Sequence, residues 1–281
     1  MSALIFALLF WVGAWALNAR LANSTYSDTR VVRVFVPVLF GLTLLVLWEG
    51  LVRGLNVSPV ILPAPSVVAQ TFVASTDTLW EDFQQTVFKG ALTGFAIGAS
   101  AAFITAILID RSAFLTRGLL PIGNFVAALP IVGIAPILVS WFGFDWHSKA
   151  AVVVVMVFFP ILVNTVQGLR EADAMQRDLM RTYAASYVQT LMKLRLPAAL
   201  PFIFNGLKIA TTLALIGAIV AEYFGSPTRG MGFRISTGVG SLSIDLVWAE
   251  IAVAAMAGTL FYSLVAWLER VLTFWHPSQK S

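Results

Sequence analysis

Long apolar runs separated by short polar stretches dominate the chain. A helix needs roughly 20 apolar residues to cross a bilayer, and about seven runs reach or approach that length. We place them at residues 2–19, 34–52, 86–109, 118–142, 149–168, 201–224 and 246–268. The first run is the shortest, and it either crosses the membrane or lies in its interface. The pattern predicts an all-α integral membrane protein with about six core transmembrane helices and one additional hydrophobic helix at the N-terminus.

The run 118–142 contains three prolines, which predicts a broken helix. Pro121, Pro130 and Pro136 lie inside it, and each interior proline removes a backbone hydrogen bond and kinks a helix. Freed backbone groups are tolerated at membrane depth only where protein or a water-filled cavity covers them. We therefore expect this segment to line the centre of the structure, although a simple packing kink would leave the same pattern.

Small residues recur at every fourth position of the run 86–109. Gly90, Gly94, Gly98 and Ala102 form this row, and such spacing lets two helix backbones approach closely. The row predicts tight packing within one chain; a seam between two copies is the second interpretation.

The polar stretch 169–200 interrupts the apolar pattern and is amphipathic. Leu179, Tyr183, Tyr187 and Leu191 recur every fourth residue, so we expect them to form one stripe of a single helix. Such a stripe at a membrane surface needs a lipid interface or a partner protein to cover it.

Two other polar segments are expected outside the membrane. In the first, 54–85, three prolines predict an extended connector and Ser66 can cap a short helix. In the second, 225–245, glycine and serine are frequent, which predicts a loop or a re-entrant turn.

Composition and charge placement support a membrane protein with a defined orientation. Hydrophobic residues make up 59% of the chain and charged residues 11%, whereas a soluble protein carries about 25% charged residues. If the N-terminus lies outside, far more basic residues fall on the cytoplasmic side than on the outer side, as the positive-inside rule requires. The cytoplasmic set is Arg20, Arg30, Arg33, Arg111, Arg117, Arg170, Arg177, Arg181, Lys193, Arg195, Arg270 and Lys280, and the outer set is Arg53, Lys149, Arg229 and Arg234.

The sequence offers no candidate catalytic residue, metal site or cofactor site. It contains no cysteine and two histidines, His147 and His276, which leaves out thiolate and imidazole metal clusters. No phosphate-binding loop of the pattern GxxxxGK[ST] occurs. The basic balance of a membrane protein does not indicate nucleic-acid binding. We therefore do not expect an enzyme.

Charged residues inside the apolar runs are the remaining candidates for function. A charge at the bilayer centre costs roughly 3 kcal/mol, so such residues face protein or water. We expect Glu49 and Glu250 to cap helices or snorkel, and Lys208 to reach the interface on its long stem. Glu222 either lines a gate, pairs with Arg229 or Arg234, or meets water at the outer interface.

The polar stretch resembles the coupling loop of membrane-spanning subunits of ABC importers. The family pattern is EAA-x3-G-x9-I-x-LP. Anchored on Leu196-Pro197, the triplet is Asp178-Leu179-Met180, the glycine place holds Ala184 and the isoleucine place holds Leu194. This chain thus departs from the pattern at the glycine and at both alanines. The order of ILPAPSVV, ALPIVGIAPILVSWFG, VFFPILVNTVQGL and AEYFGSPTRGMGFRI along residues 35–275 is similar to nitrate/sulfonate/taurine-type permeases.

The resemblance implies a type I importer in the bacterial inner membrane. Its expected partners are a second copy of the permease, an ATPase dimer that holds ATP and Mg²⁺ at the cytoplasmic face, and an external solute-binding protein. The expected domains are an N-terminal addition (1–33), the permease (34–275, with the coupling loop at 169–200) and a tail (276–281). The implied coupling residues are Asp178, Arg181, Tyr183, Ala184, Ser186, Tyr187, Leu191, Leu194 and Pro197, and the candidates for the translocation path or gate are Pro130, Pro136, Glu222 and Tyr223.

Three hypotheses about function follow, and the importer permease is the first. Its solute is expected to be a small organic molecule, because the AEYFGSPTRGMGFRI segment is similar to members that import pyrimidine precursors or riboflavin; sulfonate, taurine and nitrate are the other candidates. The second hypothesis is an ion-coupled secondary transporter that uses Glu222, Glu49 or Glu250 and needs no ATPase. The absence of two similar halves in the sequence argues against it. The third is a membrane scaffold without transport.

Overall fold

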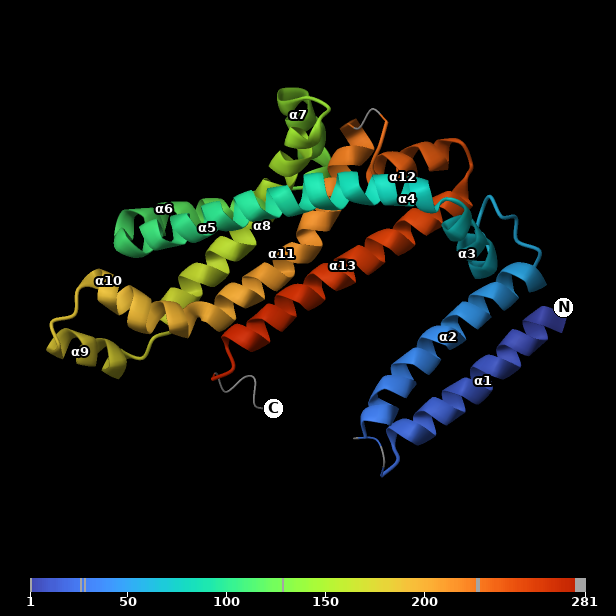
Figure 1. Ribbon diagram of the computed structural model, residues 1–281, viewed down its shortest axis with the longest axis horizontal. Helices are drawn as coiled ribbons and strands as arrows, with labels where there is room; N and C mark the ends of the chain where they lie inside the picture. The colour runs from blue at the N-terminus through green and yellow to red at the C-terminus, as the bar shows by residue number, and fades with distance from the viewer. Residues whose placement is uncertain (1, 26, 28, 128, 226–227, 276–281) are drawn as a thin grey trace. The chain divides into compact units, whose positions relative to one another are not determined.

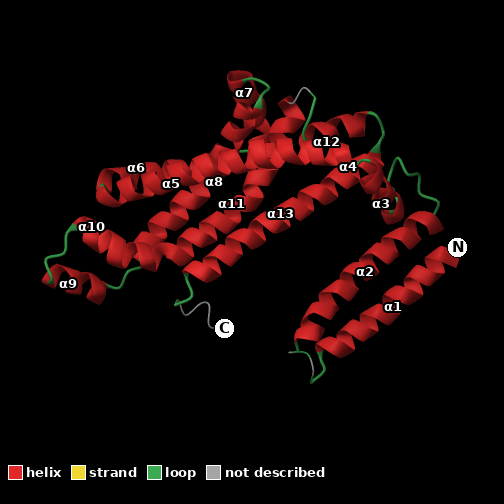
Figure 2. Ribbon diagram, viewed as in Figure 1, coloured by secondary structure: helices red, strands yellow, loops and turns green. Residues whose placement is uncertain are grey.

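The computed structural model describes residues 2–25, 27, 29–127, 129–225 and 228–275 (Figure 1), and within them every regular element is a helix (Figure 2). In chain order these are α1 (Ser2–Ala22), α2 (Arg30–Gly54), α3 (Pro65–Ala74), α4 (Thr76–Phe83), the π-helical segment η1 (Gln84–Leu92), α5 (Thr93–Arg111), α6 (Ala113–Ala127), α7 (Ile131–Phe142), α8 (Trp146–Arg170), α9 (Ala174–Thr182), α10 (Tyr187–Thr190), the π-helical segment η2 (Leu191–Arg195), α11 (Leu196–Gly225), α12 (Met231–Gly240) and α13 (Ile244–Leu272).

Six helices in the described part of the chain are long and apolar enough to cross a membrane. They cover Ala3–Ala22, Arg30–Gly54, Thr76–Arg111, Trp146–Arg170, Tyr187–Gly225 and Ile244–Leu272. The all-α prediction is therefore confirmed. The expected run 118–142 is not among the six, because it is divided between the shorter helices α6 and α7.

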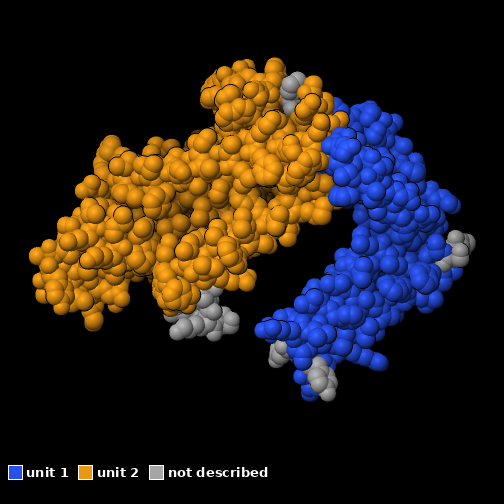
Figure 3. Space-filling view, in the orientation of Figure 1, with its two compact units in different colours: residues 1–79, 237–251 blue, residues 80–236, 252–281 orange. Residues whose placement is uncertain are grey.

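The chain divides into two compact units, coloured separately in Figure 3. The first comprises Met1–Leu79 and Thr237–Ile251, and the second comprises Trp80–Ser236 and Ala252–Ser281. In the first unit α1 and α2 form a hairpin. Gly50 and Gly54 of α2 lie directly against Ala7 and Leu4 of α1 and have no space for a Cβ. The N-terminal segment thus packs on the first expected core helix.

Glu49 in the first unit caps the following helix α3. Its carboxylate accepts hydrogen bonds from the backbone N–H of Ser66 (2.9 Å) and from the Ser66 hydroxyl (2.7 Å), and it pairs with Arg53. The capping role expected for Glu49 is confirmed. The cap expected from Ser66 itself is wrong, because the N-cap residue is Ala64 and the Ser66 hydroxyl donates to Glu49 instead.

The core of the second unit forms where α5, α8 and α11 pack closely. The glycine row of η1 and α5 faces α8: a Cβ at Gly94 would meet Val153, and one at Gly98 would meet Val157. Ala102 on the same row is fully buried. Close packing between helices within one chain, the first interpretation of the row, is confirmed.

The proline-rich segment of the second unit is broken, as expected, and the break lies at Pro130. Helix α6 ends at Ala127, and Pro130 is the N-cap residue of α7. Pro121 and Pro136 lie within α6 and α7 and interrupt neither helix. The break therefore comes at one of the three prolines.

The described residues of the segment 225–245, expected outside the membrane as a loop or a re-entrant turn, include a regular helix, so the loop interpretation is wrong. The segment contains α12, a helix of 10 residues. Its glycine content suggested a flexible turn, but Gly232 lies inside α12, where a Cβ would clash with the carbonyl oxygen of Ile219. Glycine is required there for close packing.

Candidate functional site

Asp110, Arg195 and Tyr187 form a polar cluster that joins the polar stretch to the ends of two core helices. Arg195 donates two hydrogen bonds to the Asp110 carboxylate (2.6 and 2.5 Å) and one to the carbonyl of Leu169 (2.9 Å). The Tyr187 hydroxyl donates to the same carboxylate at 2.8 Å. The guanidinium of Arg111 lies 4.6 Å from the centre of the Tyr187 ring. We call Asp110, Tyr187 and Arg195 the latch.

The latch brings together ends that the predicted orientation assigns to the cytoplasm. Asp110 and Leu169 are the penultimate residues of α5 and α8, and Arg195 ends η2 just before α11 begins. A bidentate pair between arginine and carboxylate fixes both distance and orientation. The polar stretch is therefore attached to the membrane helices through a defined joint.

The predicted single stripe of the polar stretch is wrong. Helix α9 ends at Thr182, and a new helix begins after Ser186. Leu191 is buried against Leu169, Ala199 and Ile203 of the same chain, and Tyr187 belongs to the latch. The fourfold spacing carried no information about the turn that divides the stretch.

An exposed apolar row remains on α9 and the residue after it. Met175, Leu179 and Tyr183 follow at intervals of four and are 78%, 55% and 77% exposed. No residue of α9 is buried. Arg181 and Asp178 form an exposed ion pair of 3.3 Å on this helix. The row is thus apolar, lies in a polar segment and is not covered by the described part of the chain.

Ala184 makes the turn that divides the polar stretch. Its φ of +48° lies in the left-handed region, its N–H donates to the Arg181 carbonyl, and the next N–H donates to Met180 (2.8 and 3.0 Å). This is a helix C-terminus of the kind usually closed by glycine. Two residues later Ser186 and Gln189 form a reciprocal capping box that starts α10.

Ala184→Gly is expected to stabilise the protein by up to about 1 kcal/mol, because a Cβ costs roughly that much in the left-handed region. Thermal unfolding of the purified protein measures the change. Ala185→Gly is the matched control; its φ is not positive, so the same substitution should destabilise. Equal effects of the two changes would contradict this account.

Leu194 and Pro197 lie at the start of the long membrane helix. Leu194 is in η2 and Pro197 is the second residue of α11, and both are half-buried. Helices α10, η2 and α11 follow one another without a gap over Tyr187–Gly225, so Pro197 lies inside a continuous helix. Its missing N–H comes directly after the π-helical turn η2. These two residues therefore belong to the joint between the polar stretch and the membrane.

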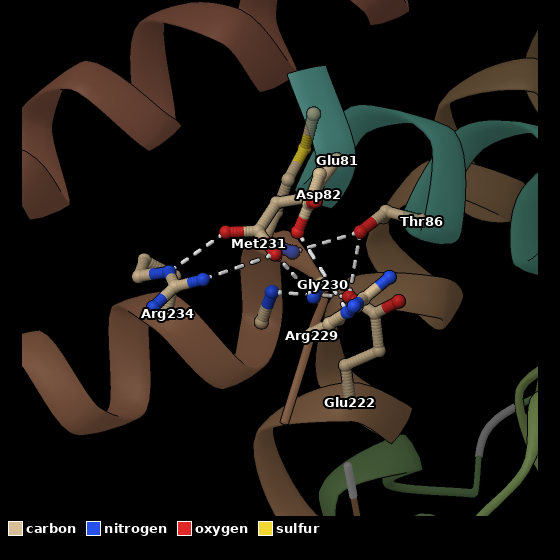
Figure 4. Close-up of polar contacts among 9 residues, drawn as sticks. Glu81, Asp82, Thr86, Glu222, Arg229, Gly230, Met231 and Arg234 are labelled. Atoms are coloured by element: carbon tan, nitrogen blue, oxygen red, sulfur yellow. Dashed lines mark hydrogen bonds and ion pairs between the residues drawn. The ribbon is translucent and has the colours of Figure 1, made fainter. Parts of the chain in front are cut away.

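Glu222 belongs to a second polar cluster, at the opposite end of α11 (Figure 4). Three successive N–H groups at the start of α12 each meet a side-chain oxygen from another helix. Gly230 N–H donates to Asp82 (2.6 Å), Met231 N–H to Thr86 (2.8 Å) and Gly232 N–H to Glu222 (3.1 Å). The Thr86 hydroxyl also donates to Glu222 at 2.7 Å. Two acidic side chains at a helix N-terminus are favoured by its dipole.

The arginines considered as partners for Glu222 pair with other carboxylates. Arg234 binds Asp82 at 2.7 Å, and Arg229 lies 3.7 Å from Glu81. Glu222 itself is 1% exposed, so the interpretation as a water-contacting interfacial residue is also wrong. Its neighbour Tyr223 is exposed and packs against Phe224.

The gate candidates lie near one another in the second unit. Around Pro136, Ala135 and Leu138 of α7 pack on Ala221, one residue before Glu222. Pro130 caps the same helix. The geometry therefore gathers Pro130, Pro136 and Glu222 in one region without assigning them a gating role.

Lys208 pairs with Glu269 of α13 at 2.7 Å, which corrects the expectation that it extends to the interface. Lys149 is another buried cation, and its ammonium donates to the carbonyls of Phe144 and Gly225 at 2.5 Å.

Sequence reasoning missed Glu269, Asp82 and Asp110 because each stands near the end of an apolar run, where a charged residue is expected simply to mark the end of a membrane helix. In the part of the chain that the structure describes, no group of three acidic or histidine side chains could hold a metal ion.

Comparison with known proteins identifies the family. Residues 94–273 match the family described as "Binding-protein-dependent transport system inner membrane component". A probable ABC transporter permease of Haemophilus influenzae is 34% identical over 84% of this chain and 96% of its own length. The formylaminopyrimidine transport permease of Halalkalibacterium halodurans is 32% identical over 89% and 99%. A putative aliphatic sulfonates transport permease of Bacillus subtilis is 32% identical over 84% and 85%. With six helices able to cross a membrane among its described residues, the chain belongs to the family of ABC transporter permeases that form the inner-membrane component of binding-protein-dependent import systems.

Proposed function

We propose that this chain forms the solute path of an ATP-driven importer and docks an ATPase subunit through α9. The observation that carries the proposal is the exposed row Met175, Leu179 and Tyr183 on a helix with no buried residue. Exposed apolar side chains on a polar segment are typical of a protein interface. ATP and Mg²⁺ would be held by that partner.

The latch gives the docked helix a mechanical connection to the membrane. A shift of α9 acts on α10 through the short turn at Ala184, and on α5 and α8 through Asp110 and Arg195. Closure of two ATPase subunits would bring the α9 helices of two permease copies together and rock their membrane helices between two states. A second copy of this chain and an external solute-binding protein complete the proposed system.

The solute is proposed to be a small organic molecule. Relatives of nearly equal identity are named for a formylaminopyrimidine and for aliphatic sulfonates, so identity alone does not choose between an uncharged heterocycle and an anion. Both classes stand as candidates for the imported solute.

Leu179→Asp tests the docking surface. A carboxylate placed in an apolar interface loses its hydration without gaining a partner. The variant should therefore retain at most about a tenth of the co-purifying ATPase and of the ATP-dependent uptake. A tenfold loss corresponds to about 1.4 kcal/mol of binding free energy. Leu55→Asp is the matched control, because Leu55 is 61% exposed and lies in the segment expected outside the membrane.

Two results would contradict the proposal. Full uptake by Leu179→Asp, with the ATPase still bound, would show that α9 is not the docking surface. Uptake that needs no ATPase and is abolished by a protonophore would instead support the secondary transporter. The carboxylate of Glu222 already accepts hydrogen bonds from Thr86 and Gly232, which does not favour its use as an ion site.

A further inference from the structure

Two asparagine side chains inside the membrane helices α8 and α11 are hydrogen-bonded to each other. The Asn205 amide donates to the side-chain oxygen of Asn164 at 3.0 Å, and the Asn164 amide donates to the carbonyl of Pro160 at 2.8 Å. Helix α11 passes close to α8 at this point, because a Cβ added to Gly206 would lie 3.0 Å from the Cβ of Asn164. The close approach holds the two amides against each other.

The asparagine pair lies at membrane depth. Helix α8 ends at Arg170, on the side that the predicted orientation assigns to the cytoplasm, and Asn164 stands about 9 Å before that end. The hydrocarbon core of a bilayer is about 30 Å thick. Asn164 is half-buried and Asn205 is exposed. An amide is thus present on the surface of the chain within the span.

The Asn205 amide has hydrogen-bonding capacity that the described part of the chain does not use. A side-chain amide carries two N–H donors and an oxygen acceptor. Asn205 uses one N–H, and no described group donates to its oxygen. Lipid tails offer neither a donor nor an acceptor. The open side of α11 at Asn205 therefore meets water or protein and not lipid.

Polar side chains continue on both sides of the asparagine pair. Gln167, one turn nearer the end of α8, is exposed, and so is Thr212, two turns farther along α11. Positions seven apart lie on the same side of a helix, so Asn205 and Thr212 share one side over about 10 Å. We call Asn164, Gln167, Asn205 and Thr212 the polar face. All four belong to the second unit.

The open side of α5 in the same unit is apolar at matching distances from its cytoplasmic end. Ile97, Ile104 and Leu108 are 52%, 58% and 53% exposed, and side chains of this kind suit contact with lipid. The polar face is therefore not a general property of the membrane helices of this chain.

A seam with a second copy is the other way to cover the polar face. Helices that meet in a membrane are lined by small residues. On the same side of α11 as Asn205, however, Ile209 and Ile216 are large and each is 44% exposed. These side chains favour a water-filled space over a tight seam.

We propose that the polar face lines the water-filled path by which the solute crosses the membrane. The proposal rests on the proposed import function and identifies the face of this chain that borders its path. The polar face contains no charged side chain. A small polar solute on this path meets uncharged groups that both donate and accept hydrogen bonds.

The reactivity of single introduced cysteines tests the proposal. The chain contains no cysteine, so Asn205→Cys and Thr212→Cys each carry one thiol. The probe is a membrane-impermeant sulfonated maleimide, added to membrane fragments from cells that make the whole transporter. The thiolate is the reactive form and is disfavoured in apolar surroundings, so each thiol on the polar face should be labelled at least about tenfold faster than its control. Label is measured on the tagged chain after its isolation.

Ile104→Cys and Ile97→Cys are the matched controls for Asn205→Cys and Thr212→Cys. Ile104 stands about 10 Å before the end of α5, and Ile97 precedes it by the same seven positions that separate Asn205 from Thr212. All four residues are exposed, so exposure within one chain does not distinguish them. Thermal unfolding identifies a variant that is not folded, and the other pair then decides the result.

Three results would overturn the proposal. The first is labelling of Asn205→Cys no faster than that of Ile104→Cys. The second is fast labelling of Asn205→Cys but not of folded Thr212→Cys, which would limit water to the membrane surface. The third is a disulfide between two copies of Asn205→Cys without labelling, which would assign the polar face to a seam. Labelling does not require the ATPase, so failure of the proposed import function has a different sign: no ATPase co-purifies and no ATP-dependent uptake occurs.

Discussion

Asp110→Ala is expected to destabilise the protein by about 3 kcal/mol and to uncouple ATP hydrolysis from transport. Removing one partner of a buried ion pair leaves the other charge uncompensated, which costs roughly that amount. Here both partners are largely shielded from solvent, and Asp110 accepts from Arg195 twice and from Tyr187 once. Thermal unfolding of the purified permease and the ratio of solute imported to ATP hydrolysed measure the two effects.

Asp178→Ala provides the control for this substitution. Asp178 also pairs with an arginine, Arg181, but both side chains are exposed, and exposed pairs contribute about 0–1 kcal/mol. The control should leave the unfolding temperature nearly unchanged. If Asp110→Ala and Asp178→Ala are equally stable, the latch is not a structural joint. If Asp110→Ala is unstable but keeps the wild-type ratio of transport to hydrolysis, the latch stabilises the chain and has no part in coupling.

Gly232→Ala is expected to have a comparable effect at the opposite end of α11. An added Cβ would overlap the carbonyl oxygen of Ile219 and lie 2.8 Å from the Cβ of Glu222. Both are parts of a packed helix, so α12 must shift away, and overpacking of this kind costs about 1–3 kcal/mol. The shift would also weaken the hydrogen bonds that Glu222, Thr86 and Asp82 make to the start of α12.

Gly240→Ala is the matched control, because Gly240 ends the same helix and no atom lies within 4 Å of its added Cβ. It should fold and transport like the wild type, whereas Gly232→Ala should unfold at lower temperature and import less solute. Equal behaviour of the two variants would show that α12 tolerates displacement and that its start is not fixed by Glu222.

The membrane helices could be predicted because their signals are local. Apolar runs located the six helices of the described residues that can cross a membrane, and the glycine row correctly indicated close packing of α5. The three prolines of 118–142 indicated a broken helix, since a proline lacks an N–H wherever it stands. Which proline breaks the helix depends on tertiary packing, and only Pro130 does so.

The two polar clusters could not be predicted because they join residues far apart in the sequence. Asp110 and Arg195 are 85 positions apart, and Thr86 and Glu222 are 136 apart. The sequence around one member of a pair does not indicate which distant residue is its partner. The stripe Leu179 to Leu191 failed for a different reason: Ala184 adopts a left-handed conformation, which sequence reasoning assigns to glycine or asparagine before alanine.

In the π-helical segment η1, the number of residues matters as much as their type, because it sets which side of the helix the residues before and after it occupy. In an α-helix, positions four apart drift by about 40° around the axis at each step, so a row of five would turn through about 160° and reach the opposite face. Asp82, Thr86, Gly90, Gly94 and Gly98 are nevertheless all buried. The wider turns of η1 between Gln84 and Leu92 offset the drift. They keep Asp82, which binds the start of α12, on the same side of the helix as the glycines that pack against α8. A single deletion within η1 would move the two sets out of phase even if every contacting side chain were retained.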